Sequence, residues 1–203
     1  MVKIYIIIHT VYHHIYQLAL AIKEGVEKVP GVEVSLFQVP ETLSEEVLAK
    51  MHAPPKPDIP VITPAQLEEA DGFIFGIPTR YGTQPGQWRA FWDATGSLWA
   101  RGALAKKFAT TFFSTASQHG GQETTALTSL TTLAHHGIIY VPLGYTSPHL
   151  TDNSEVLGGS AYGAGTIAGG DGSRKPSAKE LEVANHQGEY FAKIVQQYVR
   201  GAQ

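Results

Sequence analysis

Short, strongly apolar runs alternate with longer amphipathic segments along this chain of 203 residues. Five of the runs are rich in β-branched and aromatic residues, at 3–8, 33–37, 73–77, 108–113 and 138–142. Near-continuous runs of this kind are typical of strands covered on both faces of a sheet. The helical periodicity between them predicts parallel strands joined by right-handed crossovers. The pattern therefore predicts an α/β fold, a doubly wound five-stranded parallel sheet with helices on both faces.

Capping signals indicate where several of the helices begin. Thr42-Leu43-Ser44-Glu45 and Ser177-Ala178-Lys179-Glu180 are typical capping boxes, and Thr63 precedes a proline and Gln66 in the same relation. Apolar residues at helical spacing predict further helices at about 18–26, 88–99 and 123–135. Tryptophans 88 and 92 are expected in the core or at a subunit contact.

Composition limits the class of protein. Formal net charge is −3, which leaves no electrostatic footprint for nucleic acid or an anionic membrane surface. No apolar run approaches the ~20 residues needed to span a bilayer, and the N-terminus resembles a first strand rather than a signal peptide. Cysteine is absent, which excludes disulfides and thiolate chemistry and makes a reducing cytoplasm the default expectation.

The length fits a single domain over residues 1–203, with a long Gly-rich insertion at about 144–176. Structureless loops of that length in compact domains are usually functional or disordered. Tyr145, Tyr162 and the spaced glycines favour an ordered loop at a site or at a subunit contact.

Polar segments follow the first, third and fourth predicted strands, at residues 10–15, 78–83 and 114–118. Ligands of open α/β sheets bind beyond the carboxyl ends of such strands. A hydroxyl residue at the start of a helix can bind phosphate through free N–H groups, although Thr10 is also compatible with a plain N-capped helix. The other two segments could flank a flat heterocycle. One phosphate site and one ring site, without a dinucleotide or P-loop fingerprint, predict a mononucleotide such as FMN.

Three histidine and arginine features have alternative interpretations. His13-His14 could suggest a metal site, but neighbouring side chains at a helix start diverge and no carboxylate completes a ligand set, so we expect no metal. His135 near a helix end could simply interact with the helix dipole. Arg80 could pair with Asp93 instead of a ligand.

The chain resembles the WrbA-type NAD(P)H:quinone oxidoreductases, flavodoxin-like FMN enzymes, and is most similar to their fungal members. The resemblance covers nearly the whole chain and depends on several motifs: Val39-Pro40-Glu41-Thr42-Leu43, Ala53-Pro54-Pro55-Lys56-Pro57-Asp58, Phe75-Gly76-Ile77-Pro78-Thr79-Arg80-Tyr81-Gly82, Phe91-Trp92-Asp93-Ala94-Thr95-Gly96, Gly121-Gln122-Glu123, Thr132-Leu133-Ala134-His135-His136-Gly137 and residues 162–174.

The resemblance implies a flavodoxin-like fold, FMN as cofactor, and NADH or NADPH as electron donor. It also implies a homotetramer in exchange with dimers, with Tyr12 on the nicotinamide side and Trp99 on the substrate side. His135 is expected beside both cofactor and substrate. Combined with the loop analysis, the expected FMN contacts are Thr10, Val11, Tyr12, His13, His14, Ile15, Pro78, Thr79, Arg80, Tyr81, Ser114, Thr115, Ala116, Ser117, Gln118, His119, Gly120 and His135.

Two of the three loops differ from the family pattern. The first usually reads Tyr-Ser/Thr-x-Tyr-Gly-His, whereas His9 and His13 stand here in place of the tyrosine and the glycine. If position 13 requires a positive φ, a side chain there costs roughly 1 kcal/mol. The loop after the fourth strand, residues 114–121, is one residue longer than the usual Ser-Thr-Gly-Thr-Gly-Gly-Gly and poorer in glycine.

The function predicted from these observations is two-electron reduction of quinones by NAD(P)H through FMN, with ping-pong kinetics and no protein nucleophile. Two alternatives from other classes remain. One is a one-electron flavodoxin-type carrier. Such carriers usually have a strongly acidic docking surface, and a net charge of −3 argues against one here. The other is a flavin-poor regulatory or structural relative.

Overall fold

The computed structural model describes residues 1–201 and contains six strands in one sheet. The strands are β1 (Val2–Ile8), β2 (Val32–Gln38), β3 (Gly72–Pro78), β4 (Phe108–Thr115), β5 (Ile139–Tyr140) and β6 (Gly165–Ile167). The helices are α1 (His14–Glu27), α2 (Glu45–Lys50), α3 (Gly86–Asp93), α4 (Gly96–Ala100), α5 (Gln122–His135) and α6 (Ala178–Gly201), with 3₁₀ turns at Pro64–Glu69 and Pro148–Thr151.

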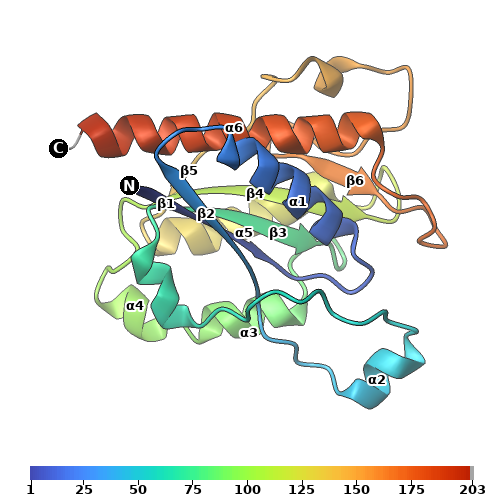
Figure 1. The fold of residues 1–203 in the computed structure, drawn as a ribbon. Coiled ribbons are helices and arrows are strands. Elements are labelled where there is room, and N and C mark those ends of the chain that lie inside the picture. The colour runs from blue at the N-terminus through green and yellow to red at the C-terminus, as the bar shows by residue number, and fades with distance from the viewer. Residues whose placement is uncertain (202–203) are drawn as a thin grey trace.

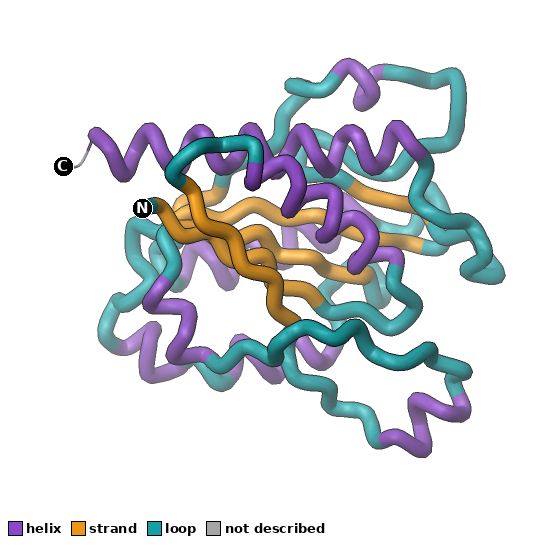
Figure 2. The backbone as a smooth tube through the Cα atoms, viewed as in Figure 1, coloured by secondary structure: helices purple, strands orange, loops and turns teal. Residues whose placement is uncertain are grey.

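The sheet is parallel throughout, in the order β2-β1-β3-β4-β5 (Figures 1 and 2). This is the doubly wound order whose switch point lies between β1 and β3. Helices α1 and α6 cover one face and share a core with the strands, while the aromatic side chains of α3 join a second core on the other face. The prediction of a doubly wound α/β sheet is confirmed.

The edge of the sheet beyond β4 differs from the prediction. The fifth run, expected as a strand over 138–142, pairs with β4 only through Ile139 and Tyr140. The other half of that edge is β6, which pairs with β4 at Phe113–Thr115 and comes from the segment expected to be a loop. Residues 141–164 therefore interrupt the edge strand, and the chain returns to the same edge after them.

Two predicted helices differ in the structure from their expected bounds. The helix expected from Thr42 begins at Glu45, because Ser44 is the N-cap and its hydroxyl accepts the Val47 N–H at 3.4 Å. The segment expected to be one helix over 88–99 forms two helices, α3 and α4, separated at Ala94 and Thr95. The capping box at Ser177 is confirmed, with reciprocal hydrogen bonds to Glu180.

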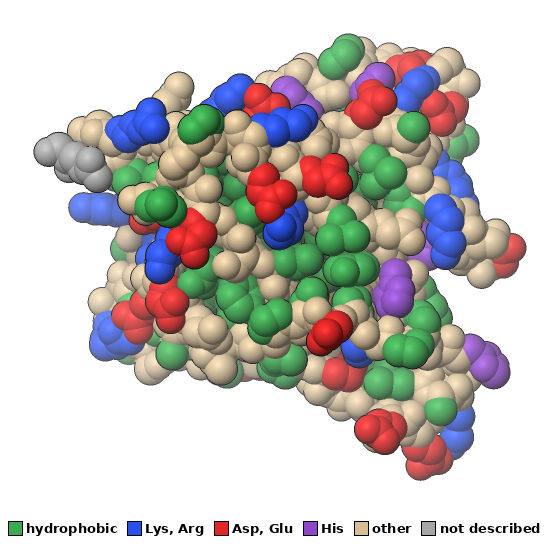
Figure 3. Space-filling model, viewed as in Figure 1, with side chains coloured by type: hydrophobic (Ala, Val, Ile, Leu, Met, Phe, Trp, Pro, Cys, Tyr) green, Lys and Arg blue, Asp and Glu red, His purple; other side chains and the backbone are tan. Residues whose placement is uncertain are grey.

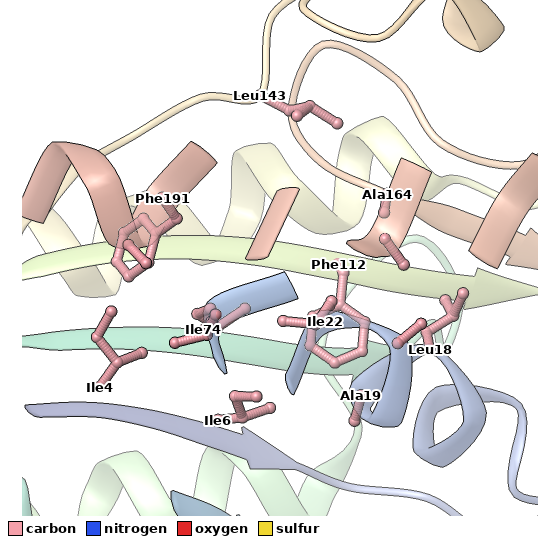
Figure 4. Packing of buried hydrophobic residues seen from close by; sticks show 14 of the residues in the cluster. Ile4, Ile6, Leu18, Ala19, Ile22, Ile74, Phe112, Leu143, Ala164 and Phe191 are labelled. Atoms are coloured by element: carbon pink, nitrogen blue, oxygen red, sulfur yellow. The ribbon is translucent and has the colours of Figure 1, made fainter. Parts of the chain in front are cut away.

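The two cores hold the sheet between the helix layers. Phe112, Ile74 and Ile6 of three strands belong to one core cluster with Leu18 and Ile22 of α1 on one face (Figure 4). On the other face, the Trp88 indole is fully buried and its Nε1 donates to the Gly76 carbonyl at 3.1 Å, and Trp92 packs beside it. Both tryptophans therefore belong to the core, as predicted. The carboxyl ends of β1, β3 and β4 are thus held in fixed register.

No helix within residues 1–201 combines the length and the hydropathy needed to cross a membrane. On the face shown in Figure 3, acidic and basic side chains are interspersed around hydrophobic side chains near its middle. Strand β2 is half-buried along most of its length, because it lies at the edge of the sheet.

Candidate functional site

A cavity of about 440 Å³ lies beyond the carboxyl ends of β1, β3, β4 and β6, at the β1/β3 switch point. This volume is in the usual range for small-molecule sites, roughly 300–1,000 Å³. The three predicted loops meet here, as the parallel sheet requires. The lining consists of Thr10, Val11, Tyr12, His14, Ile15, Pro78, Thr79, Arg80, Ser114, Thr115, Ala116, Ala168, Gly169, Gly170, Asp171 and Gly172.

One end of the cavity is formed by the N-terminus of α1. Helix α1 begins at His14, so its first N–H groups have no preceding helical carbonyl, and Gln17 is the first to donate back, to His13 O at 2.9 Å. The Thr10 hydroxyl accepts the His13 N–H at 3.1 Å and shapes the turn before the helix. Free N–H groups and the positive end of the helix dipole make this end suitable for an anion such as phosphate.

The second loop turns sharply after β3. Arg80 and Thr83 exchange backbone hydrogen bonds of 2.9 and 3.1 Å around Tyr81 and Gly82, which have φ values of 56° and 75°. Two consecutive positive φ values are typical of a type I′ hairpin turn. Arg80 Nη1 donates to the Thr79 carbonyl at 2.8 Å, and no ion pair within residues 1–201 involves Arg80. The alternative pairing with Asp93 is therefore not formed, and Arg80 lines the cavity.

The third loop is held by Gln122, the middle residue of the motif Gly121-Gln122-Glu123. The Gln122 amide donates to Thr115 Oγ1 at 3.1 Å and to the Thr166 carbonyl at 3.0 Å, and its oxygen accepts the Gly159 N–H at 2.7 Å. Gln122 is buried at the start of α5. It therefore ties the end of β4 to β6 and to the interrupted edge.

The fourth wall, residues 168–172, was not among the predicted site residues. It follows β6 directly, and Ala168 N–H donates to the Thr115 carbonyl at 2.8 Å. His14 Nε2 donates to the Arg174 carbonyl at 2.9 Å and connects this wall to α1. Burial lowers the pKa of His14, so its imidazole is neutral at pH 7. The signal available in the sequence was the cluster Gly169-Gly170-Asp171-Gly172 near the end of the Gly-rich insertion.

The cavity fits a ligand that is anionic at one end and flat at the other. Its lining includes four serine or threonine residues and one arginine, and three of the five residues of the wall at 168–172 are glycines that carry no side chain. A Cβ at Gly170 or Gly172 would meet no atom within 4 Å, so open space lies beside both glycines. Among residues 1–201, Asp171 is the one acidic residue in the lining.

Several predicted site residues lie outside this lining. His13 has φ 69°, and its Nε2 donates to the Pro55 carbonyl at 2.9 Å instead of facing the cavity. Gln118 and His119 line a neighbouring cavity of about 410 Å³ with Leu157 and Ser160. The Tyr81 side chain is fully exposed at the hairpin tip. The remaining predicted residues outside the lining are Ser117, Gly120 and His135.

His135 and Trp99 lie together, but away from the main cavity. They line a separate cavity of about 280 Å³ with Arg89 and Asp93, and none of its lining residues is shared with the main cavity. The Trp99 side chain is 58% exposed. Within one protomer the structure therefore does not bring His135 or Trp99 to the loops after β1, β3 and β4.

Comparison with known proteins identifies the family of the chain. The model of the family described as NADPH-dependent FMN reductase matches residues 13–150. The chain is 55% identical to NAD(P)H quinone oxidoreductase PST2 of Candida albicans, with 97% of each chain covered. It is 58% identical to quinone-oxidoreductase QR2 of Triphysaria versicolor, over 95% of this chain and 94% of the relative.

Among solved structures, a flavodoxin-like WrbA-like protein from Agrobacterium tumefaciens superimposes with a TM-score of 0.64 at 24% identity, covering 97% of this chain and 99% of that one. This likeness shows the flavodoxin-like fold. The family model covers more than half of the chain, and the two relatives match it over almost their full length. The chain therefore belongs to the NADPH-dependent FMN reductase family, in which it groups with the quinone oxidoreductases as its motifs predicted.

Proposed function

We propose that this protein reduces quinones by two electrons at the expense of NADH or NADPH, with FMN bound in the cavity at the β1/β3 switch point. The observation that carries the proposal is that the α1 N-terminus, Arg80 and the wall at 168–172 border one cavity, in a chain of this family. Relatives with more than half of their residues identical are named as NAD(P)H quinone oxidoreductases.

Bound FMN would supply a ring that accepts a hydride from nicotinamide and delivers two electrons to a quinone. The residues of the chain bind and orient it. Thr10 and the first N–H groups of α1 would hold the phosphate, and Arg80 with Ser114 and Thr115 would meet the polar edge of the ring. No side chain is required as a nucleophile. Donor and quinone would occupy one shared site in turn, which predicts ping-pong kinetics.

Self-association is part of the proposal. If Trp99 and His135 border the substrate side, as the family resemblance implies, they must come from a second copy, because the protomer keeps them in a separate cavity. A dimer or tetramer would meet this need. We expect the mass measured by light scattering after size-exclusion chromatography to be two or four times that of the 21.9 kDa chain.

We also propose a cytoplasmic location. The lack of cysteine is compatible with a reducing compartment but does not require one. Fractionation of cells with compartment markers tests this part directly.

The visible spectrum of the purified protein, with and without added FMN, tests the cofactor. Yellow protein whose flavin is retained on desalting is expected, and a protein that stays colourless at saturating FMN would contradict the proposal. Consumption of NADH or NADPH that depends on benzoquinone then separates the enzyme from a one-electron carrier, which would show little such turnover.

The residue at position 13 gives a prediction about strain. His13 is the N-cap of α1 at φ 69°, where a side chain is disfavoured and glycine is not. His13→Ala and His13→Gly both lose the hydrogen bond to Pro55 and the edge contact with the Tyr16 ring, but only His13→Gly relieves the strain. We expect the glycine variant to exceed the alanine variant by roughly 1 kcal/mol in free energy of unfolding, and to bind FMN more tightly. Urea unfolding and flavin titration of the two variants measure this; equal values would rule out the strain argument.

A further inference from the structure

The phosphate-binding turn, residues 10–13, is held from outside the cavity by the segment that joins β2 to β3. This segment carries α2 and projects from the body of the molecule in Figure 1. Three hydrogen bonds connect it to the turn. Lys56 Nζ donates to the Thr10 carbonyl at 2.8 Å, His13 to Pro55 O at 2.9 Å, and the Tyr12 hydroxyl to Met51 O at 3.0 Å.

Lys56 is fixed in turn by Glu41. Its Nζ lies 2.6 Å from Glu41 Oε2, and both side chains are mostly buried, at 29% and 18% exposure. The other carboxylate oxygen accepts Gln87 Nε2 at 2.6 Å and the Leu43 N–H at 3.1 Å. Because Gln87 is on α3, which packs in the core, this chain of contacts connects the turn to a rigid element.

The Glu41 carboxyl group is ionised near neutral pH. Burial by itself raises the pKa of Glu41, but hydrogen bonds from Lys56 and Gln87 outweigh it and bring the pKa to about 2. Glu41 therefore neutralises Lys56 at pH 7. Lys56 does not line the cavity, so it does not take the place of a lysine that contacts phosphate directly.

The bond to Thr10 orients a peptide group. In a trans peptide the C=O of Thr10 and the N–H of Val11 point in opposite directions. With the carbonyl directed at Lys56, the Val11 N–H points away from Lys56, and Val11 lines the cavity. A turn that is free to rotate this peptide would lose a correctly directed donor.

We infer that the Glu41–Lys56 ion pair is a positioning device that holds the phosphate-binding turn in its anion-binding conformation without touching the cofactor. The inference rests on the proposed function, since the anion is the phosphate of FMN. It gives the partly buried pair a role in selecting a phosphorylated flavin over riboflavin, which lacks that group.

The experiment compares FMN and riboflavin binding to apoprotein by quenching of flavin fluorescence. Lys56→Met is expected to weaken FMN binding about tenfold or more while riboflavin binding changes little, so that the preference for FMN falls. Lys56→Arg should restore much of it. Lys50→Met is the matched control, because Lys50 forms a similar pair with Glu46 in the same segment at 2.6 Å, but both side chains are more than 70% exposed.

Glu41→Gln separates positioning from direct charge. If the pair positions the turn, this variant also weakens FMN binding; if Lys56 were a counterion for phosphate, freeing it from Glu41 would tighten binding. Unchanged or tighter binding of FMN by Glu41→Gln, or an unchanged preference in Lys56→Met, overturns the inference.

Hydrogen exchange of the apoprotein provides a readout without flavin. Peptides covering residues 9–17 should exchange faster in Lys56→Met than in Lys50→Met, and equal rates overturn the inference. Wild-type protein that binds no flavin would instead contradict the proposed function, whereas the exchange result would still decide the positioning role.

Discussion

Replacing Glu180 with alanine is expected to lower the free energy of unfolding by about 3–5 kcal/mol and to weaken FMN binding. Glu180 is on α6, and only 1% of it is exposed. Its oxygens accept Arg174 Nη1 at 3.0 and 2.9 Å, the Gly158 N–H at 2.9 Å and the Thr166 hydroxyl at 2.8 Å. Removing the carboxylate therefore takes an acceptor from each of these donors.

The loss should reach the cavity through Arg174. The same guanidinium donates to the Ile167 carbonyl at 2.7 Å and the Val156 carbonyl at 2.9 Å, and the Arg174 carbonyl accepts His14 Nε2. Glu180 therefore organises both ends of the wall at 168–172. We expect limited proteolysis of the variant to cut within residues 144–176 faster than in the wild type.

Glu182→Ala is the control for this prediction. Glu182 lies on the same helix and pairs with His149 at 2.7 Å, but its side chain is 65% exposed, so the cost should stay below about 1 kcal/mol. Urea unfolding at pH 7 gives both values. If Glu180→Ala costs no more than Glu182→Ala and keeps its FMN affinity, the buried carboxylate does not organise this wall.

The sequence predicted the fold well because the strand signals were strong. Runs of Ile and Phe in β1, β3 and β4 are buried on both faces, and their order along the chain leaves few possible topologies. β6 was missed because Gly165-Thr166-Ile167 has no apolar run, and its strand conformation comes from pairing with β4. Residues 141–164 separate it from β5, so no local pattern showed that both belong to one edge.

The sequence predicted which loops border the candidate site, but it did not indicate the residues that hold those loops in place. Loops after parallel strands must meet at one edge, which is why Thr10, Arg80 and Ser114 could be grouped from sequence alone. Gln122, Lys56 and Glu180 act through contacts with residues distant in the chain. Such contacts have no spacing rule, and only the fold reveals them. The roles of Trp99 and His135 stay predictions, because they depend on a second copy of the chain.

Protonation of His9 is expected to make the protein less stable in mild acid. His9 follows β1, only 2% of it is exposed, and its Nε2 has no hydrogen-bond partner within the described residues. Burial first, and the nearby Lys56 cation second, lower its pKa from 6.5 to about 4. The unfolded chain therefore binds a proton between pH 6.5 and 4 that the folded chain does not bind.

The sign and size follow from this difference in proton binding. Stability is full above pH 6.5 and falls as the pH drops toward 4, because the unfolded state is favoured by its extra proton. Between pH 7.5 and 4.5 the loss attributable to His9 is about 2.5 kcal/mol. Glu41 contributes little in this window, since its own stabilisation is lost only below pH 4.5, toward its folded pKa of about 2.

His9→Gln tests the effect, because glutamine stays neutral throughout. Unfolding free energies from urea titrations at pH 7.5 and 4.5 should differ by about 2.5 kcal/mol less in the variant than in the wild type. His14, His136 and His186, whose burial also lowers their pKa, contribute equally to both proteins and cancel. His119→Gln, at an exposed position, should leave the loss of stability in acid unchanged. Equal losses in wild type and His9→Gln would show that His9 does not set the acid limit. A reduced loss would mean that a buried neutral imidazole beside Thr10 and Lys56 keeps a further positive charge out of this cluster at pH 7.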